Sequence, residues 1–326
     1  MPANVTPEYE KAEQRYRQAT TDDERLAALQ EMLSAIPKHK GTEKMQADIK
    51  RRLSHLRREQ QKTGHSTGPD PFHIPKSGAG QVALAGAPNT GKSSLLVATT
   101  NAAAKVADYP FTTIVPQPGM WQKDDIQIEL VDTPPLTPDH VPAGLMGTLR
   151  NADVVCVVAE AGEVALEQAE SVLSGLGARG LTLCSRPRDE LAASETNEKS
   201  GLLIVNKADL AGAGTIDSLR ELYSEKLDTV AVSARTGQGL EDWFNRLWQL
   251  LAMIRVYAKE PGKPPDLHKP FTLPIGSTVA DLACLIHRDL PERMKFARLW
   301  GHGRFEGQHM HKTEPLQDRD IVEIHE

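Results

Sequence analysis

The segment that most constrains this chain is Gly86–Ser93, which reads GAPNTGKS and fills the pattern G-x-x-x-x-G-K-[ST] at every fixed position. It follows an apolar run and precedes a helix-like run, the context in which this pattern binds phosphate. The two glycines let backbone N–H groups approach and surround a polyphosphate. Lys92 can reach the β- and γ-phosphates, the Ser93 hydroxyl can ligate Mg²⁺, and the following helix adds its N-terminal dipole. We therefore expect a nucleoside triphosphate site formed by Gly86, Ala87, Pro88, Asn89, Thr90, Gly91, Lys92, Ser93 and Ser94.

A second motif, Asn206–Asp209 (NKAD), predicts which base is bound. The Asp209 carboxylate can accept hydrogen bonds from guanine N1–H and N2–H₂, whereas adenine lacks the N2 amine and presents N1 as an acceptor. Asn206 can bond the base and brace the phosphate loop, while the stem of Lys207 can stack on the base. NKAD alone is a short motif, but in a chain that also contains a phosphate loop it favours GTP over ATP as the nucleotide.

Two more polar loops follow apolar runs. Asp132 comes directly after the run 126–131 and would hold Mg²⁺ through water. Ser233, Ala234 and Arg235 come after the run 229–232 and can offer backbone N–H groups to guanine O6. Because ligands bind at the carboxyl ends of strands in α/β sheets, we expect these loops and the first two motifs to meet at one site.

The order of apolar runs predicts an α/β fold, a doubly wound and mostly parallel sheet around the phosphate loop. The expected strands are Val82–Ala85, Ile126–Val131, Val154–Ala159, Leu202–Val205 and Thr229–Val232. The polar stretch 185–200 is expected to be an exposed excursion. A helix over Leu240–Leu251 closes the region, and its aromatic residues are expected to pack rather than bind.

Four parts are expected along the chain. Residues 1–66 form a helical N-terminal region, residues 67–79 a linker rich in Gly, Pro and Ser, residues 80–253 the phosphate-loop domain, and residues 254–326 a compact α+β module. The last module is predicted to contain strands at Pro270–Ile275, Phe296–Trp300 and Ile321–His325, with a helix from Ser277/Thr278 through Leu290.

The N-terminal region carries a basic segment. Helices are predicted from Pro7, after the capping box at Thr21–Glu24, and from near Thr42. Between Lys38 and Lys62 there are nine Lys or Arg residues and three acids, a net charge of +6. Such a segment is either a solvated helix face or a contact with RNA or the ribosome.

Composition excludes several classes of protein. The 326 residues include 38 Lys and Arg and 44 Asp and Glu, so the net charge of −6 gives no general attraction to nucleic acid. Three cysteines without metal-ligand spacing fit a reducing compartment. The start, MPANVTPEYEK, lacks the apolar core of a signal peptide, and the longest apolar run, Val154–Ala159, is too short to span a bilayer. We expect a cytoplasmic protein with no membrane partner.

The motifs together resemble GTPases of the Obg-like and DRG (developmentally regulated GTP-binding) group. The residues that carry the likeness are GAPNTGKSSL at 86–95, DYPFTT at 108–113 and NKAD at 206–209. Residues 255–326 are similar to the TGS domain, which implies a β-grasp fold. The likeness is closer to DRG proteins than to Obg, because no glycine-rich Obg domain precedes the GTPase core.

This resemblance implies roles for residues that spacing alone does not assign. In the family the second Thr of F-T-T ligates Mg²⁺, which points to Thr113, with Thr112 as the fallback. Where related GTPases have a hydrophobic residue at the position of Leu136, a phosphate-loop Asn helps to bind K⁺, which points to Asn89. The family also implies association with RNA or the ribosome and a DRG-type protein partner.

The sequence departs from the family pattern in two places. The family motif D-x-x-G reads Asp132-Thr-Pro-Pro135, and Pro135 has no backbone N–H to offer the γ-phosphate. The DRG insertion inside the GTPase core has little room between Val158 and Leu202. Mg²⁺-dependent GTP binding with slow hydrolysis is the main expectation. A nucleotide-binding module with negligible turnover and a P-loop ATPase are the alternatives.

Overall fold

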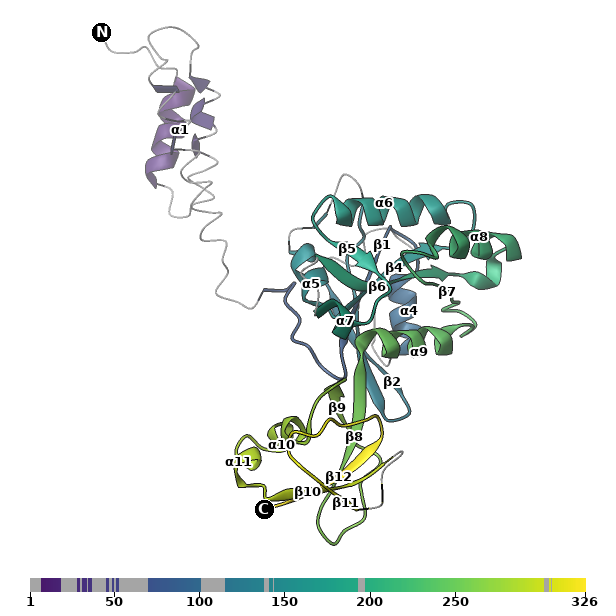
Figure 1. Ribbon diagram of the computed structural model, residues 1–326. Coiled ribbons are helices and arrows are strands. Elements are labelled where there is room, and N and C mark those ends of the chain that lie inside the picture. The colour runs from purple at the N-terminus through teal and green to yellow at the C-terminus, as the bar shows by residue number, and fades with distance from the viewer. Residues whose placement is uncertain are drawn as a thin grey trace. The chain divides into compact units, whose positions relative to one another are not determined.

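The computed structural model divides into two compact units, Met1–Asp70 and Pro71–Glu326 (Figure 1). The residues that it describes are 7–18, 28–29, 31–33, 35–36, 45–46, 49, 51–52, 70–100, 115–137, 141–142, 144–192, 197–301, 305 and 307–326. Among these residues no helix is long and apolar enough to cross a membrane.

The first unit contains helix α1 (Pro7–Gln18), which begins at the proline that the sequence marks as a helix start. Its buried residues pack with apolar side chains of the next segments, as the helical spacing predicts. The buried cluster consists of Tyr9, Ala12, Leu29, Met32, Ile36 and Ile49. In the basic segment, Arg51 and Arg52 are exposed, while most of residues 38–62 lie outside the described residues.

The phosphate-loop domain is built on a seven-stranded sheet in the order β2-β3-β1-β4-β6-β5, with β7 paired to β6. All pairs are parallel except β2 with β3. The strands are β1 (Gln81–Gly86), β2 (Gln117–Lys123), β3 (Ile126–Asp132), β4 (Val154–Glu160), β5 (Thr182–Cys184), β6 (Glu198–Asn206) and β7 (Thr229–Ala231). The fold is the expected α/β P-loop architecture.

Helices cover both faces of this sheet (Figure 1). Alternate residues of β1 point to opposite faces, so Val82 and Leu84 join one core cluster while Ala83 and Ala85 join the other. The first cluster contains residues of α4 (Lys92–Thr99) and α9 (Leu240–Leu251), and the second contains residues of α5 (Leu145–Asn151), α6 (Ala165–Gly177) and α8 (Ala213–Tyr223). Cys156 is fully buried in the first cluster, and burial raises the pKa of its thiol to about 12.

The structure differs from the sequence expectations at three places in this domain. Strands β2 and β5 were not predicted. The segment 185–200 was expected to be an exposed excursion. Helix α7 (Arg188–Ala192) within it has no buried residue, but the last residues of the segment belong to the sheet as the start of β6. Part of the expected linker, from Pro71 on, packs with the domain: Ile74 is buried and accepts a hydrogen bond from Gln81, and Gly78 bridges to Ile128.

The C-terminal domain is a five-stranded sheet in the order β11-β10-β12-β8-β9, with a helix packed on one face. β8 and β12 are parallel and the other pairs antiparallel, which gives the expected β-grasp arrangement. Thr278 and Asp281 form a capping box at the start of the helix, where the sequence places it. The elements are β8 (Met253–Lys259), β9 (Phe271–Pro274), α10 (Val279–Ile286), α11 (Leu290–Arg293), β10 (Phe296–Trp300), β11 (Gln308–Met310) and β12 (Asp320–His325).

The junction between the two domains of this unit is short. Helix α9 ends at Leu251 and strand β8 begins at Met253, so Ala252 alone separates them. Ala252 adopts a left-handed conformation with φ of 52°, which turns the chain sharply at the end of the helix.

Candidate nucleotide site

The sequence motifs meet at one edge of the seven-stranded sheet. Register pairs Leu84 with Asp132 and Glu160 with Asn206, so the carboxyl ends of β1, β3, β4 and β6 lie side by side. The loop after β7 reaches the same edge through the backbone N–H of Ala208, which bonds to Val232 O at 3.0 Å. Loops at the carboxyl ends of parallel strands are where α/β sheets bind their ligands.

Two glycines of the phosphate loop have no space for a side chain. A Cβ at Gly86 would lie 2.5 Å from the carbonyl oxygen of Val158, and a Cβ at Gly91 would lie 2.3 Å from Nδ2 of Asn206. Gly91 also has φ of 87° as the N-cap of α4. The loop therefore needs glycine at both positions, and the N-terminus of α4 opens directly into it.

Lys92 is folded back onto its own loop. The side chain is 6% exposed, and its Nζ donates to Gly86 O at 3.0 Å and to Ala87 O at 2.9 Å. Burial lowers the pKa of Lys92 to about 8, against a smaller opposing effect of Asp132. The ammonium group of Lys92 therefore lies at the phosphate loop. Bound phosphate oxygens would replace the two neutral carbonyl oxygens as its hydrogen-bond acceptors.

Ser93 and Asp132 are in direct contact. The Ser93 hydroxyl donates to Oδ2 of Asp132 at 2.5 Å, and Asp132, at the end of β3, is 1% exposed. A hydroxyl and a carboxylate oxygen at this distance are a donor set suited to Mg²⁺, which prefers hard oxygen ligands and keeps several waters. These two residues could hold the ion beside the phosphates.

The chain after Asp132 runs close under the phosphate loop. The Thr133 hydroxyl donates to Leu84 O at 2.7 Å, and the backbone N–H of Leu136 donates to Gly86 O at 3.0 Å. Pro135 is buried and offers no N–H. The Leu136 side chain is 5% exposed and packs in the core cluster with α5 and α6 residues, so it points away from the loop.

Asn206 ties two loops together. Its Nδ2 donates to Thr90 O at 3.0 Å, and its Oδ1 accepts from the backbone N–H of Ala234 at 3.2 Å. The side chain is 1% exposed and uses both ends of its amide. The sequence predicts that Asn206 braces the phosphate loop. In the structure Asn206 also bonds to the loop after β7, so it holds the two loops together.

Asp209 is oriented by the loop that follows β7. The Ser233 hydroxyl donates to its Oδ1 at 2.6 Å, and Arg235 pairs with its Oδ2. The hydrogen bond from Ser233, aided by Arg235, holds the pKa of Asp209 below its usual value, so the carboxylate is charged and an acceptor. A purine that presents two N–H donors would meet this carboxylate.

Sequence reasoning missed Glu160. This residue ends β4 at the same sheet edge, and its carboxylate pairs with Lys207 at 2.8 Å. Lys207 has φ of 61°, and the ion pair holds its ammonium group at this edge of the sheet. The position of Glu160 at the end of a predicted strand was the available clue. Thr112 and Thr113 lie outside the described residues, and Asn89 is exposed at the tip of the phosphate loop with φ of 64°.

Two family models match the chain. Residues 81–184 match a model described as "50S ribosome-binding GTPase", and residues 254–326 match the TGS domain. The chain is 26% identical to developmentally-regulated G-protein 2 of Arabidopsis thaliana, over 92% of this chain and 90% of that protein. It is 28% identical to an uncharacterized GTP-binding protein of Halobacterium salinarum, over 93% and 98%.

Among solved structures, the chain matches the G domain of the T. maritima FeoB iron transporter at 25% identity. That match covers 52% of this chain and 97% of that domain, with a TM-score of 0.38. The fold and the converging loops define a P-loop GTPase that carries a C-terminal TGS domain. Within that class the chain is similar to the developmentally regulated GTP-binding (DRG) proteins along more than nine-tenths of its length, and its GTPase domain binds and hydrolyses GTP. GTPases of this fold use Mg²⁺ with the nucleotide.

Proposed function

We propose that this GTPase hydrolyses GTP slowly with Mg²⁺ and couples the change of nucleotide to association with RNA or the ribosome. The observation that carries the nucleotide part is the Asn206 brace, which joins the phosphate loop to the loop that orients Asp209. A single bound nucleotide would span both loops.

Each motif residue has a proposed role at this site. The backbone of residues 86–94 and Lys92 hold the phosphates. Ser93, Asp132 and Thr113 hold Mg²⁺, Thr113 being assigned from the family resemblance alone. Asp209 reads guanine N1–H and N2–H₂, Lys207 lies along the base, and the residues that complete the base pocket are Asn206, Ser233, Ala234 and Arg235.

Slow turnover follows from the residue after the D-x-x-G-like segment. Many GTPases have Gln there to orient the attacking water. Leu136 has no hydrogen-bonding side chain and is packed in the core. Transition-state charge would then be offset by Lys92, by a Mg²⁺ ion that Ser93 and Asp132 would hold, and by a K⁺ ion that Asn89, an exposed residue at the loop tip, would help to bind.

Phosphate release from GTP by the purified chain tests this proposal. We expect slow but measurable turnover that requires Mg²⁺ and is abolished in Lys92→Ala. Competition with ATP tests the base: an ATPase of the P-loop class would lose bound GTP to equimolar ATP, whereas a carboxylate at Asp209 favours guanine. Release at the rate of the Lys92→Ala background would reject the hydrolytic function.

Pro135 supports a second candidate, a nucleotide-binding interaction module with negligible turnover. A proline here cannot donate a backbone N–H to a γ-phosphate, which is the contact that couples this segment to the nucleotide state. Tight GTP binding with no phosphate release above the Lys92→Ala background would favour this candidate over the GTPase.

The proposed partners are RNA or the ribosome, through the basic segment 38–62 and the TGS domain, and a DRG-type protein. The proposed location is cytoplasmic. Contacts to RNA phosphates make the affinity fall as salt rises. A triple variant in which Lys50, Arg51 and Arg52 are each changed to Gln should therefore show a weaker salt dependence of binding to a 30-nucleotide single-stranded RNA. An unchanged slope would leave this segment as a solvated helix face.

A further inference from the structure

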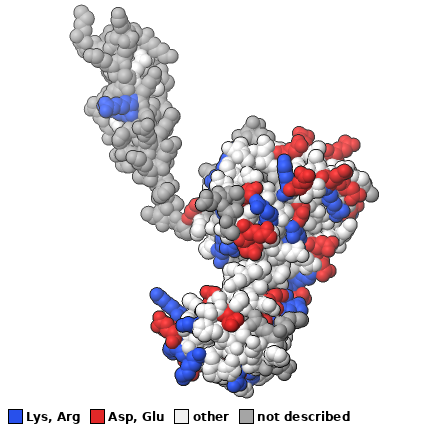
Figure 2. Space-filling view, in the orientation of Figure 1, with Lys and Arg blue, Asp and Glu red and all other residues white. Residues whose placement is uncertain are grey.

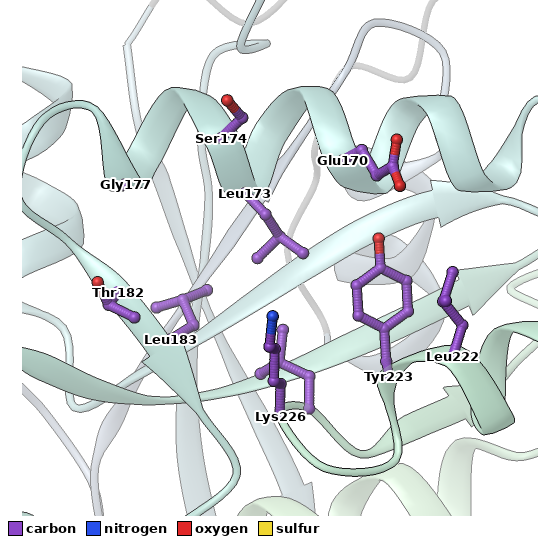
Figure 3. A pocket seen from close by; sticks show the side chains of 10 residues that line it. Glu170, Leu173, Ser174, Gly177, Thr182, Leu183, Leu222, Tyr223 and Lys226 are labelled. Carbon is purple, nitrogen blue, oxygen red and sulfur yellow. The ribbon is translucent and has the colours of Figure 1, made fainter.

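An apolar furrow lies between α6 and α8 on the GTPase domain. One pocket of about 510 Å³ is lined by α6, β5 and the end of α8, and its apolar lining includes Leu173, Leu183 and Leu227 (Figure 3). A second pocket of about 510 Å³ lies between the N-terminal parts of the same two helices and is lined by Leu166 and Leu219, among others. Leu222 lines both, so the two pockets adjoin at this residue, and together they are called the furrow here.

Large apolar side chains are exposed along this furrow. Leu222 is 58% exposed and Leu166 is 38% exposed. Val164 and Leu210 adjoin its N-terminal end in the chain and are 47% and 68% exposed. Apolar side chains gathered around a hollow mark a surface that binds a partner, whereas scattered ones need no explanation.

One buried polar group at the furrow lacks a partner within the described part of the chain. The Tyr223 hydroxyl is buried and makes no hydrogen bond with any residue that the structure describes. Figure 3 shows the ring pointing its hydroxyl toward the side of the furrow where Glu170 lies. Burial and the charge of Glu170 raise the pKa of Tyr223. A Lys or Arg side chain of a partner that pairs with Glu170 would neutralise the carboxylate next to the Tyr223 hydroxyl.

The helices that border the furrow are acidic. Residues 163–177 and 213–223 together contain five acids and one base, Arg220, which pairs with Asp217 at 3.4 Å. Lys226, just beyond α8, is a second base and lines the first pocket, so acids outnumber bases by five to two along the furrow. Figure 2 shows acidic side chains gathered over the part of the surface where α6 and α8 lie. A nucleic acid or an anionic membrane would be repelled here, and a basic partner attracted.

We propose that this furrow binds an amphipathic helix of a protein partner, with an apolar stripe at i, i+3, i+4 and i+7 and Lys or Arg on its flanks. The 13 residues of α6 make the furrow about 20 Å long, which fits three to four helical turns. A groove between two helices with an apolar floor is the recurring way to bind such a helix. The surface is separate from the nucleotide site, because none of the proposed nucleotide contacts lines it.

Three labelled 18-residue peptides and the full chain test this proposal. The first has Leu at helical spacing and Lys elsewhere, the second has Glu in place of Lys, and the third is the first in scrambled order. We expect the first to bind at least tenfold more tightly than the other two, by fluorescence anisotropy. Glu170→Gln should weaken that binding several-fold, since it removes a charge that faces the peptide.

Matched aspartate variants locate the binding. Leu222→Asp, at an exposed position of the furrow, should weaken the first peptide at least tenfold. Leu285→Asp, at a leucine that is 54% exposed on α10 of the TGS domain, should leave it unchanged. Absence of binding, equal binding of the scrambled peptide, or equal binding by Leu222→Asp would overturn the proposal. So would a dimer in sedimentation that Leu222→Asp separates, because the occupant would then be a second copy of this chain.

Discussion

Asp125, in the turn between β2 and β3 of the GTPase domain, accepts hydrogen bonds from Arg255 and Tyr257 of the TGS strand β8. The Arg255 contact, from Nη1 to Oδ1, is 3.2 Å long. Burial acts to raise the pKa of Asp125, but the bonds from Tyr257 and Arg255 outweigh it and hold that pKa below its usual value. Arg255 also holds Asp318 through two contacts of 3.0 and 2.6 Å, so one buried guanidinium joins carboxylates of both domains.

Asp125→Ala should destabilise the chain by about 1–3 kcal/mol, because it leaves a buried Tyr257 hydroxyl without its acceptor and Arg255 with one carboxylate instead of two. Urea unfolding followed by tryptophan fluorescence measures the change. Glu260→Ala is the matched control, since Glu260 pairs with Lys263 on the exposed surface and should have little effect. Equal loss in both variants would contradict a structural role for the Asp125 contacts.

Asp209→Asn should weaken GTP binding about 100-fold or more and improve binding of xanthosine triphosphate, because the amide then matches the O2 carbonyl of xanthine. Titration calorimetry with both nucleotides measures the switch. Arg235→Ala is informative beside it. Its side chain is 73% exposed and pairs with Asp209, so its removal should leave GTP affinity equal or higher. Unchanged GTP affinity in Asp209→Asn would contradict the base-recognition role.

GTP binding should take up protons above pH 8. Lys92 loses its proton in the nucleotide-free protein as the pH rises through about 8, whereas bound phosphates would restore it. Calorimetry at pH 8.5 in two buffers of different ionisation enthalpy should therefore show uptake of more than half a proton, and uptake should be small at pH 7.

The same shift has a consequence for folding. An unfolded Lys92 keeps its proton up to about 10.5, so between pH 8 and 10.5 the unfolded chain binds more protons and this group's burial cost declines as the pH rises. Lys92→Arg, whose guanidinium stays charged, should show neither proton uptake nor this dependence. Proton uptake that persists in Lys92→Arg would assign it to another group.

Hydrolysis should be faster in KCl than in NaCl at equal ionic strength if Asn89 helps to bind K⁺ beside the phosphates. Asn89→Ala should remove the difference and leave GTP affinity nearly intact, since the side chain is exposed and makes no hydrogen bond with the described residues. Phosphate release under single-turnover conditions measures the step itself. Equal rates of native protein in both salts would exclude a potassium ion from the reaction.

Leu136→Gln should not create a faster enzyme. The side chain is packed in the core cluster with α5 and α6, so an amide there is buried without a partner rather than aimed at an attacking water. We expect unchanged or slower hydrolysis and a loss of about 2 kcal/mol in unfolding free energy. An increase in turnover without loss of stability would show that residue 136 can face the phosphates.

Much of the nucleotide site could be predicted from sequence because its parts are local. Each motif follows an apolar run, and parallel strands bring the run ends to one edge, so Asp132 and Asn206 could be placed without knowing any contact. The bond from Asn206 to Ala234 and the pair of Glu160 with Lys207 depend on register between strands, which spacing along the chain does not specify.

The elements that were missed have tertiary causes. Strand β2 contains Pro118 and Gly119, which oppose strand formation, and it is stabilised by pairing with β3 along its full length. Strand β8 contains Arg255, a charged residue that a hydropathy pattern assigns to the surface. Arg255 is buried because it pairs with two carboxylates, Asp125 and Asp318, which the sequence does not reveal. Residues 71–79 have the composition of a linker, and the burial of Ile74 and Ala79 and the bridge from Gly78 to Ile128 show that they belong to the domain.

The single residue between α9 and β8 limits how the two domains can move. Ala252 has two soft backbone torsions, and the Asp125–Arg255 contact restrains the chain a second time nearby. The inner face of α9 is part of the GTPase core, through Trp243, while β8 lies inside the TGS sheet. A rotation of α9 about its axis would therefore be transmitted directly to β8 and the TGS sheet, because no flexible linker separates the helix from the strand.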